Sequence, residues 1–331
     1  MGGGYNNIAR MFYLGHWDTS SVKNMNECFR YNAERFEGVE NWNMENVVSA
    51  NYMFDGCLCF NRPVGRWNVC SLQSMDYMFC DTQRFNQSLN TWVWSDQLTS
   101  LNNVFSGCLS LNQSFSNWKT QKVTNMHATF RGCVSMTWDQ WQIQDSWDFS
   151  SVTTLSSFFC RNENFNCPVD KMVVSKVEDF SYLFDGCRKF NQPLSSWRTC
   201  SATNFEGMFR GCLSFNHPVD HFNISKAKRF SYMFENCVFF FQPLYHWSLS
   251  CFSEMEGMFG QRKSLGPPPK TALPFALVIH FWLKETGRCI KPDSIHYTEP
   301  FLSDVKAYFS SCPEERKRCW DLLLLTLDVR K

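Results

Sequence analysis

Cysteine and histidine are the residue types of this chain with the clearest chemical potential, because thiolates and imidazoles bind metals and act as nucleophiles. The 331 residues include 17 cysteines and 7 histidines. Two groups are close enough in sequence to share an ion: Cys57 with Cys59, and Cys212 with His217 and His221. Neither group has the paired C-x-x-C spacing of a zinc site. We therefore predict that the chain holds no metal and no cofactor.

Six of the cysteines recur at one position of a sequence repeat. Stacked equivalents would lie about 5 Å apart with parallel side chains, whereas a disulfide needs side chains that converge. We therefore expect small, buried, free thiols. The odd total and the lack of an apolar signal-peptide core favour a reducing compartment. The six are Cys57, Cys108, Cys133, Cys187, Cys212 and Cys237.

The other residues that could do chemistry form no catalytic pattern. The sequence has no Gly-rich phosphate loop, no nucleophile elbow and no recurring pair of inward carboxylates. Lys and Arg number 32 against 31 Asp and Glu, so the balance does not suggest a nucleic-acid partner. The longest apolar run, residues 275–283, is far shorter than the roughly 20 residues that cross a bilayer. We predict no enzyme, no small-molecule substrate and no membrane insertion.

A repeat of about 25 residues positions all of these side chains. Two ladders of aromatic residues define it and share the same irregular steps of 26 and 29 residues. We expect both ladders to form the core of stacked units. The first ladder is Phe54, Phe79, Phe105, Phe130, Phe159, Phe184, Phe209, Phe234 and Phe259. The second includes Trp67, Trp92, Trp118, Trp147, Trp197 and Trp247, with Met172 and Phe222 in two of the places.

The sequence pattern of each unit predicts one short strand and one short helix. The strand is the L-x-x-W stretch, such as residues 194–199, and the helix carries apolar residues at i, i+3 and i+7, as in residues 123–130 and 177–184. A Phe-Asn pair follows, whose Asn bonds backbone groups of its own or the next unit, or alternatively forms an exposed ligand-binding ladder. A tyrosine stripe (Tyr52, Tyr77, Tyr182, Tyr232) is interpreted either as packing between units or as a docking surface.

The consensus FNQPL-x-x-W-x-x-S-x-V-x-x-M-x-x-MF-x-x-C resembles the BspA-type leucine-rich-like repeat over residues 11–260. That repeat occurs in tandem in surface proteins of mycoplasmas and other bacteria, in protists and in giant DNA viruses. The resemblance implies a binding or structural role and supplies no catalytic residues. Together with the ladders, it predicts an α/β solenoid: a leucine-rich-repeat-like, right-handed stack of short parallel strands and helices.

Two segments depart from the repeat. The 29-residue step holds an insertion with Trp138 and Trp141, which either pack on the base of their loop or form an exposed anchor for a partner. The repeat domain is expected to span residues 1–260, and residues 261–331 form a Pro-rich linker and a helical C-terminal cap. Because departures from a packing rule often mark function, we predict partner contacts at Trp138, Trp141, Arg316, Lys317 and Arg318.

These features predict a non-enzymatic scaffold that binds other proteins within a larger assembly. The most specific hypothesis is a minor capsid or virion component of a large DNA virus, by analogy with the repeat's occurrence there. It places the protein inside the cell or in the virion. The alternative is a secreted or cell-surface adhesin or receptor of the bacterial type.

Overall fold

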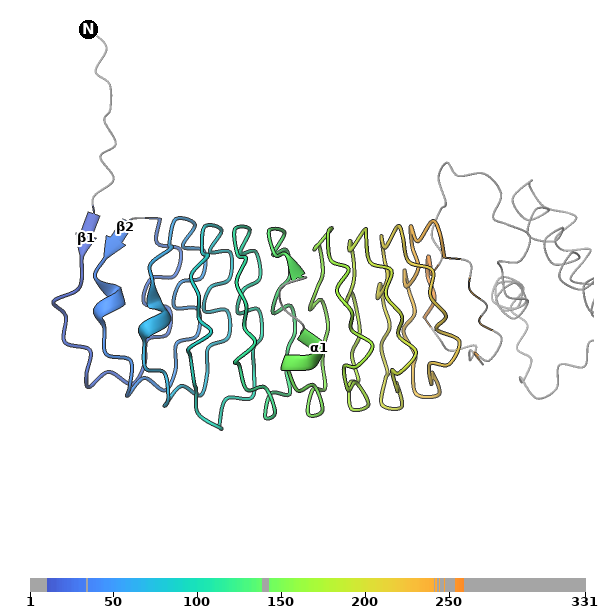
Figure 1. The fold of residues 1–331 in the computed structure, drawn as a ribbon, viewed down its shortest axis with the longest axis horizontal. Coiled ribbons are helices and arrows are strands. Elements are labelled where there is room, and N and C mark those ends of the chain that lie inside the picture. The colour runs from blue at the N-terminus through green and yellow to red at the C-terminus, as the bar shows by residue number, and fades with distance from the viewer. Residues whose placement is uncertain are drawn as a thin grey trace, which may run out of the picture.

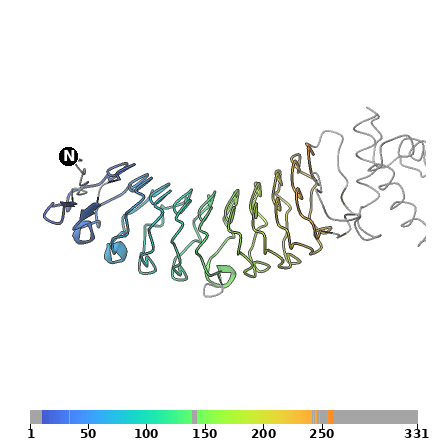
Figure 2. The same cartoon turned by 90° about the horizontal axis from the view of Figure 1, so that it is seen from above.

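The structure, a computed structural model, describes residues 11–33, 35–138, 143–240, 242, 244, 247 and 254–258. Similar coils lie one behind another along its longest axis (Figure 1). Seen from above, the row of coils follows a shallow arc (Figure 2). The predicted linker and cap (residues 261–331), as well as Trp141 and Phe259, lie outside the described residues. No helix within the described ranges is long and apolar enough to cross a membrane.

Backbone hydrogen bonds join each coil to the next through one segment, which we call the inter-coil ladder (residues 49–56 and their equivalents). Its alternate N–H groups donate to the following coil: Ala50 to Ser74, Tyr52 to Asp76, Phe54 to Met78 and Gly56 to Cys80. Isolated parallel bridges mark the start of the segment, as in Asn24–Ser49 and Ser49–Ser74. Each coil thus supplies the hydrogen-bond partners that its neighbour's backbone needs.

The inter-coil ladder occupies the position where the sequence predicts a helix, and that prediction is wrong for the described coils. Other N–H groups bond within the coil, from Met53 to the carbonyl of Ala50 and from Cys57 to that of Phe54. Tyr52 and Gly56 have φ angles of 56° and 70°. A left-handed residue every fourth position interrupts a right-handed helix, so the segment consists of turns.

The L-x-x-W stretch is likewise a turn and not the expected strand in most coils. In residues 194–197, the Trp197 N–H donates to the Leu194 carbonyl at 3.1 Å. The same turn is a 3-10 helix in η1 (Val39–Asn41) and η2 (Val64–Arg66). The named strands among the described residues are β1 (Met11–Tyr13) and β2 (Arg35–Glu37), which pair in parallel with Met11 opposite Arg35. A short helix, α1 (Ile143–Ser146), lies in the insertion.

Aromatic rings fill the interior of the stack. Phe209 is fully buried, and its ring stacks on Phe184 and Phe234 with centroids 5.8 and 5.6 Å apart. The ring of Phe215 lies only 4.2 Å away within the same coil. Equivalent rings are buried along the described array: Phe54, Phe79, Phe105, Phe130, Phe159, Phe184 and Phe234, with Trp67, Trp92, Trp118, Trp147, Trp197 and Trp247. Such stacking adds to the hydrophobic gain of burying the rings.

The indole N–H of each buried tryptophan at the repeat position of Trp197 also donates to a backbone carbonyl of the preceding coil. Trp197 Nε1 donates to the Val169 carbonyl at 2.9 Å. Phe222 takes the tryptophan position in the next coil, and its side chain has no N–H to donate. There, His221 Nε2 donates at 2.9 Å to the equivalent carbonyl, that of Leu194. The neighbouring side chain therefore replaces the hydrogen bond that the substitution removes.

Candidate functional site

The repeated cysteines are hydrogen-bonded parts of the core. Each thiol donates to the carbonyl of the ladder phenylalanine in the preceding coil, as Cys212 does to Phe184 at 3.0 Å. Burial raises the pKa of the Cys57 thiol to about 12, so the donor form persists at neutral pH. The described cysteines are all free thiols. The same bond is made by Cys57, Cys108, Cys133, Cys187 and Cys237.

The structure does not bring Cys212, His217 and His221 together as a metal site. The Cys212 thiol is buried, while His217 Nε2 lies 3.1 Å from the Asn191 carbonyl on the surface. His221 is engaged with Leu194. In the other pair that was considered, Cys57 is buried and Cys59 is exposed.

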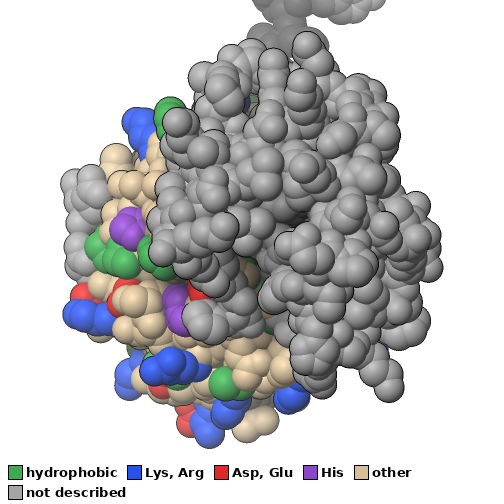
Figure 3. All heavy atoms as spheres, turned by 90° about the vertical axis from the view of Figure 1, so that its right-hand side faces the viewer, with side chains coloured by type: hydrophobic (Ala, Val, Ile, Leu, Met, Phe, Trp, Pro, Cys, Tyr) green, Lys and Arg blue, Asp and Glu red, His purple; other side chains and the backbone are tan. Residues whose placement is uncertain are grey.

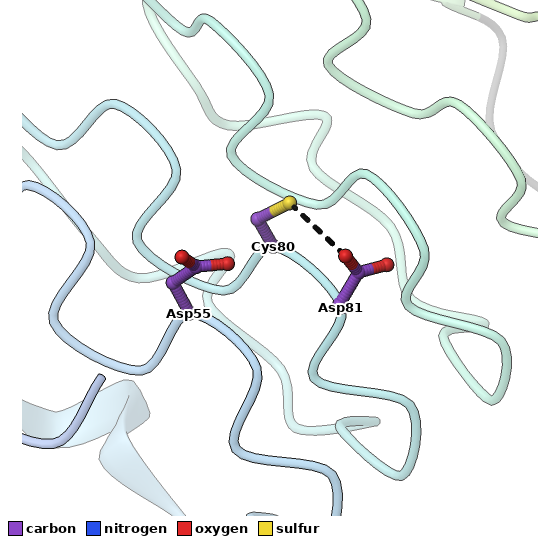
Figure 4. A group of neighbouring side chains, drawn as sticks. All are labelled: Asp55, Cys80 and Asp81. Atoms are coloured by element: carbon purple, nitrogen blue, oxygen red, sulfur yellow. Dashed lines mark hydrogen bonds between the residues drawn. The ribbon is translucent and has the colours of Figure 1, made fainter. Parts of the chain in front are cut away.

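One different group of possible ligands lies within a small volume: Asp55, Cys80 and Asp81, whose ligand atoms are within 4.8 Å of one another (Figure 4). Asp55 already forms an ion pair with Arg30, at 2.9 Å. Burial, followed by the charges of the two aspartates, raises the pKa of Cys80 to about 12. Its thiol stays protonated and contacts Asp81 at 3.9 Å. Because Asp55 is already neutralised by Arg30 and Asp81 is an exposed surface carboxylate, we assign no metal here.

Trp138 is not the exposed anchor that one reading of the insertion predicted. Its side chain is only 3% exposed, and its ring packs edge-on against Phe130, Phe159 and Phe165 with centroids 5.0–5.7 Å apart. The coil with the extra residues thus adds Trp138 to the aromatic core. Trp141 and the basic group Arg316–Arg318 lie outside the described residues.

The candidate site is the surface of the inter-coil ladder, where tyrosine and arginine side chains gather. We call it the Tyr–Arg face (Arg30, Tyr52, Tyr77, Tyr182, Arg210 and Tyr232). At its N-terminal end the rings of Tyr52 and Tyr77 stack with centroids 4.6 Å apart. The guanidinium of Arg30 lies 4.4 Å from the Tyr52 ring and is held by Asp55. This half is therefore a cation–π group fixed by an ion pair.

The C-terminal half of the Tyr–Arg face repeats this chemistry. Arg210 lies 6.0 Å from the Tyr232 ring, and its Nε donates to Glu235 at 2.7 Å. The Tyr182 hydroxyl donates to Glu206. Burial and that hydrogen bond raise the pKa of Tyr182 to about 12, so its phenol remains a neutral donor. Both halves keep their tyrosines half-buried, with one side anchored and the other open to solvent.

Small side chains separate the two halves. The positions equivalent to Tyr77 and Tyr182 in the coils between them hold Asn103, Ala128 and Ser157. These span four coil steps, or about 19 Å at roughly 4.8 Å per step. The Tyr–Arg face therefore has two clusters of aromatic and charged side chains, one on each side of a central strip of smaller side chains.

The Phe-Asn pairs lie on another side of each coil and mainly serve the fold. The side-chain oxygen of Asn166 accepts the backbone N–H of Asn191 at 2.9 Å, and Asn191 does the same for Asn216 at 3.0 Å. Gln192 donates to both the backbone and the side-chain oxygen of Asn166. The asparagines thus bond the next coil, the structural one of the two roles considered for them.

Sequence reasoning weighed the tyrosines but missed the charged column beside them. Its residues follow the ladder phenylalanine directly, as in Arg30, Asp55, Asp185, Arg210 and Glu235. Opposite charges 25 residues apart, Arg30–Asp55 and Arg210–Glu235, were the available signal. On the side shown in Figure 3, Lys and Arg side chains of the described part lie at separate points with acidic groups between them.

The comparisons with known proteins concern the repeat itself. No curated protein and no solved structure matches the chain. A family model described as "Mycoplasma protein of unknown function, DUF285" matches three times, over residues 5–98, 93–184 and 161–269. These matches overlap and cover most of the sequence. The chain therefore belongs to this family of mycoplasma-type repeat proteins of unknown function.

Proposed function

We propose that this chain is a non-enzymatic protein-binding scaffold, built as a right-handed, leucine-rich-repeat-like solenoid, whose Tyr–Arg face contacts the partner protein. One observation carries the proposal: half-exposed tyrosines and arginines gather on one face and are held there by stacking and ion pairs. Tyr and Arg are enriched among the residues that dominate interface energies. Their fixed geometry lowers the conformational entropy lost on binding.

The spacing of the two clusters indicates the shape of the partner. A partner that reaches both must extend about 19 Å along the stack and cross the strip of Asn103, Ala128 and Ser157. The alternation of Arg30 with Asp55 and of Arg210 with Glu235 offers both signs of charge. These features suit a protein surface with mixed charges, and they favour it over nucleic acid or a small-molecule substrate.

Site-specific cross-linking tests the proposal in the native assembly. A photoreactive amino acid replaces Tyr77 in one variant and Tyr232 in another, and Arg198, exposed outside the face, in a control. Both face positions should cross-link the same protein, at yields well above those of the control. Arg210→Ala should reduce the cross-link at position 232 without lowering the free energy of unfolding by more than about 1 kcal/mol, because the Arg210–Glu235 ion pair is partly exposed. Equal yields at all three positions would refute the proposal.

We propose two alternative settings for the scaffold, which an experiment can separate. A minor capsid or virion component, or another intracellular assembly, is supported by the buried thiols that donate as S–H groups to carbonyls. The alternative is a secreted or cell-surface adhesin or receptor, by analogy with the bacterial surface proteins whose repeat this chain resembles. Alkylation of the denatured, unreduced protein separates them. Recovery of nearly all 17 thiols supports the first, and extensive disulfide bonding supports the second.

A further inference from the structure

The two ion pairs of the Tyr–Arg face have the same direction along the stack. In the N-terminal cluster Arg30 lies one coil before Asp55, and in the C-terminal cluster Arg210 lies one coil before Glu235. All four residues directly follow a phenylalanine at the ladder position. Each cluster therefore presents a positive charge toward the N-terminal end of the stack and a negative charge toward the C-terminal end.

Two copies of the face that meet with antiparallel stacks bring opposite charges together at both clusters. A two-fold axis parallel to the ladder segments keeps each repeat position opposite itself and reverses the order of the coils. With the coil of Arg30 counted as the first and the axis at the fifth, Arg30 lies opposite Glu235 of the second copy. Asp55 likewise lies opposite Arg210. A shift of one coil would place Arg30 opposite Arg210, or Asp55 opposite Glu235, so the charges favour one register.

Other side chains of the ladder segments fit the same register. Tyr77 in the third coil lies opposite Tyr182 in the seventh, which brings two half-buried rings together. Asp76 lies opposite Ser181, so this carboxylate meets a hydroxyl group and not another charge. Arg131, in the fifth coil, lies on the axis opposite its own copy. A direct contact between two guanidinium groups would oppose the pairing, so the separation of the two copies at this point matters.

The curvature of the stack keeps the middles of two such faces apart. The stacked rings of Tyr52 and Tyr77 have centroids 4.6 Å apart, whereas those of Trp67 and Trp92 are 6.2 Å apart. The coils are therefore closer together at the Tyr–Arg face, which lies on the inner side of the arc, while α1 lies on its outer side (Figure 2). Two inner faces touch first near their ends, where the clusters lie. The two copies of Arg131 remain separated and hydrated at the centre.

We propose that a second copy of this chain is a partner of the Tyr–Arg face, in an antiparallel two-fold dimer held by the two clusters. The inference rests on the proposed function, because it names a protein that this face binds. The side chains of Arg30 and Glu235 are 31% and 23% exposed, so each can reach the second copy while it keeps its own ion pair. Two-fold symmetry makes every such contact twice.

Photo-cross-linking of the purified full chain tests the pairing directly. A photoreactive amino acid in place of Tyr77 should give a cross-linked dimer, and mass spectrometry should place the link in the seventh coil, near Tyr182. Within one chain these positions are four coil steps, or about 19 Å, apart. Such a link therefore joins two copies. The same amino acid at the exposed Arg198, outside the face, should give no dimer.

Sedimentation velocity of charge variants tests the register. Glu235→Gln removes the negative charge opposite Arg30 and should raise the Kd of the dimer about three- to tenfold, because the contact occurs twice. The matched control is Asp145→Asn in α1, which breaks the exposed ion pair to Lys171 on the outer side of the arc. The control and the central variant Arg131→Ala should change the Kd by less than about twofold. Thermal unfolding shows that each variant stays folded.

Three outcomes would overturn the inference. A chain that stays monomeric up to about 100 μM does not pair with itself, and the proposed function then stands if the face cross-links a different protein in the native assembly. No cross-link from the face, in the purified chain or in the assembly, would refute the proposed function as well. Links from position 77 to the third coil, or equal Kd values for Glu235→Gln and Asp145→Asn, would show that the antiparallel register is wrong.

Discussion

The replacement of an indole donor by His221 leads to a sharp prediction. His221→Phe keeps a ring beside Phe222, whose centroid is 5.1 Å from that of the imidazole, but removes the donor to the Leu194 carbonyl. Leu194 is fully buried, and a buried carbonyl that loses its donor costs about 1–2 kcal/mol. The free energy of unfolding should fall by that amount.

The rescue is Phe222→Trp, which restores the donor found in neighbouring coils. Trp197 reaches the equivalent carbonyl of Val169 at 2.9 Å, so an indole at position 222 should reach that of Leu194. The double variant should recover most of the stability lost in His221→Phe. A double-mutant cycle should therefore give a coupling energy of about 1 kcal/mol or more.

Urea denaturation of the four proteins measures this coupling, and His217→Phe is the matched control. His217 contacts the carbonyl of Asn191, but Asn191 is exposed and water can take over the bond. The control should lose less than about 0.5 kcal/mol. A coupling energy below roughly 0.3 kcal/mol would be within the additivity expected of independent sites. It would refute the idea that His221 compensates for the missing indole.

Three further predictions concern the core and the ladder, and urea denaturation checks each. Phe209→Ala should cost about 3–5 kcal/mol, since its ring is fully buried, whereas the half-exposed Tyr182→Ala should cost less than half of that. Gly207→Ala should cost about 1–2 kcal/mol, because φ is 57° and the added Cβ would lie 2.5 Å from the Tyr182 ring. Burial raises the pKa of Cys57 to about 12 from 9.0. The unfolded thiol therefore loses its proton first, and stability should fall above about pH 9, by up to about 1.4 kcal/mol per pH unit for each such thiol. Unchanged stability at pH 10 would contradict this.

The two aromatic ladders could be predicted from the sequence because burial of large rings leaves a direct trace in residue type and spacing. The local backbone could not. Apolar residues such as Ala50, Met53, Phe54 and Cys57 recur at helical intervals, yet alternate N–H groups of this segment, including those of Ala50 and Phe54, donate to the next coil. A turn closed every fourth residue places side chains almost as a helix does. Hydrogen bonds to the neighbouring coil decide between a helix and these turns, and the periodicity of apolar residues carries no information about those bonds.

The candidate site was harder to predict for a related reason. Trp138 looked like a departure from the repeat, but the structure gives it a place against Phe130 and Phe159. The pairing of Arg30 with Tyr52 depends on which side chains of adjacent coils point the same way. That follows from the left-handed residues, which carry no unique sequence signature when they are Tyr, Asn or Ala.

The direction of the inter-coil hydrogen bonds restricts the symmetry of any assembly through the ends. In each described ladder the alternate N–H groups point toward the C-terminal end and the matching carbonyls toward the N-terminal end. One end therefore offers acceptors and the other donors. Two ends that both present carbonyl acceptors cannot pair, so an isologous two-fold dimer through these backbone edges is ruled out. Copies joined by them would associate heterologously, head to tail, and such contacts generate rings or open filaments.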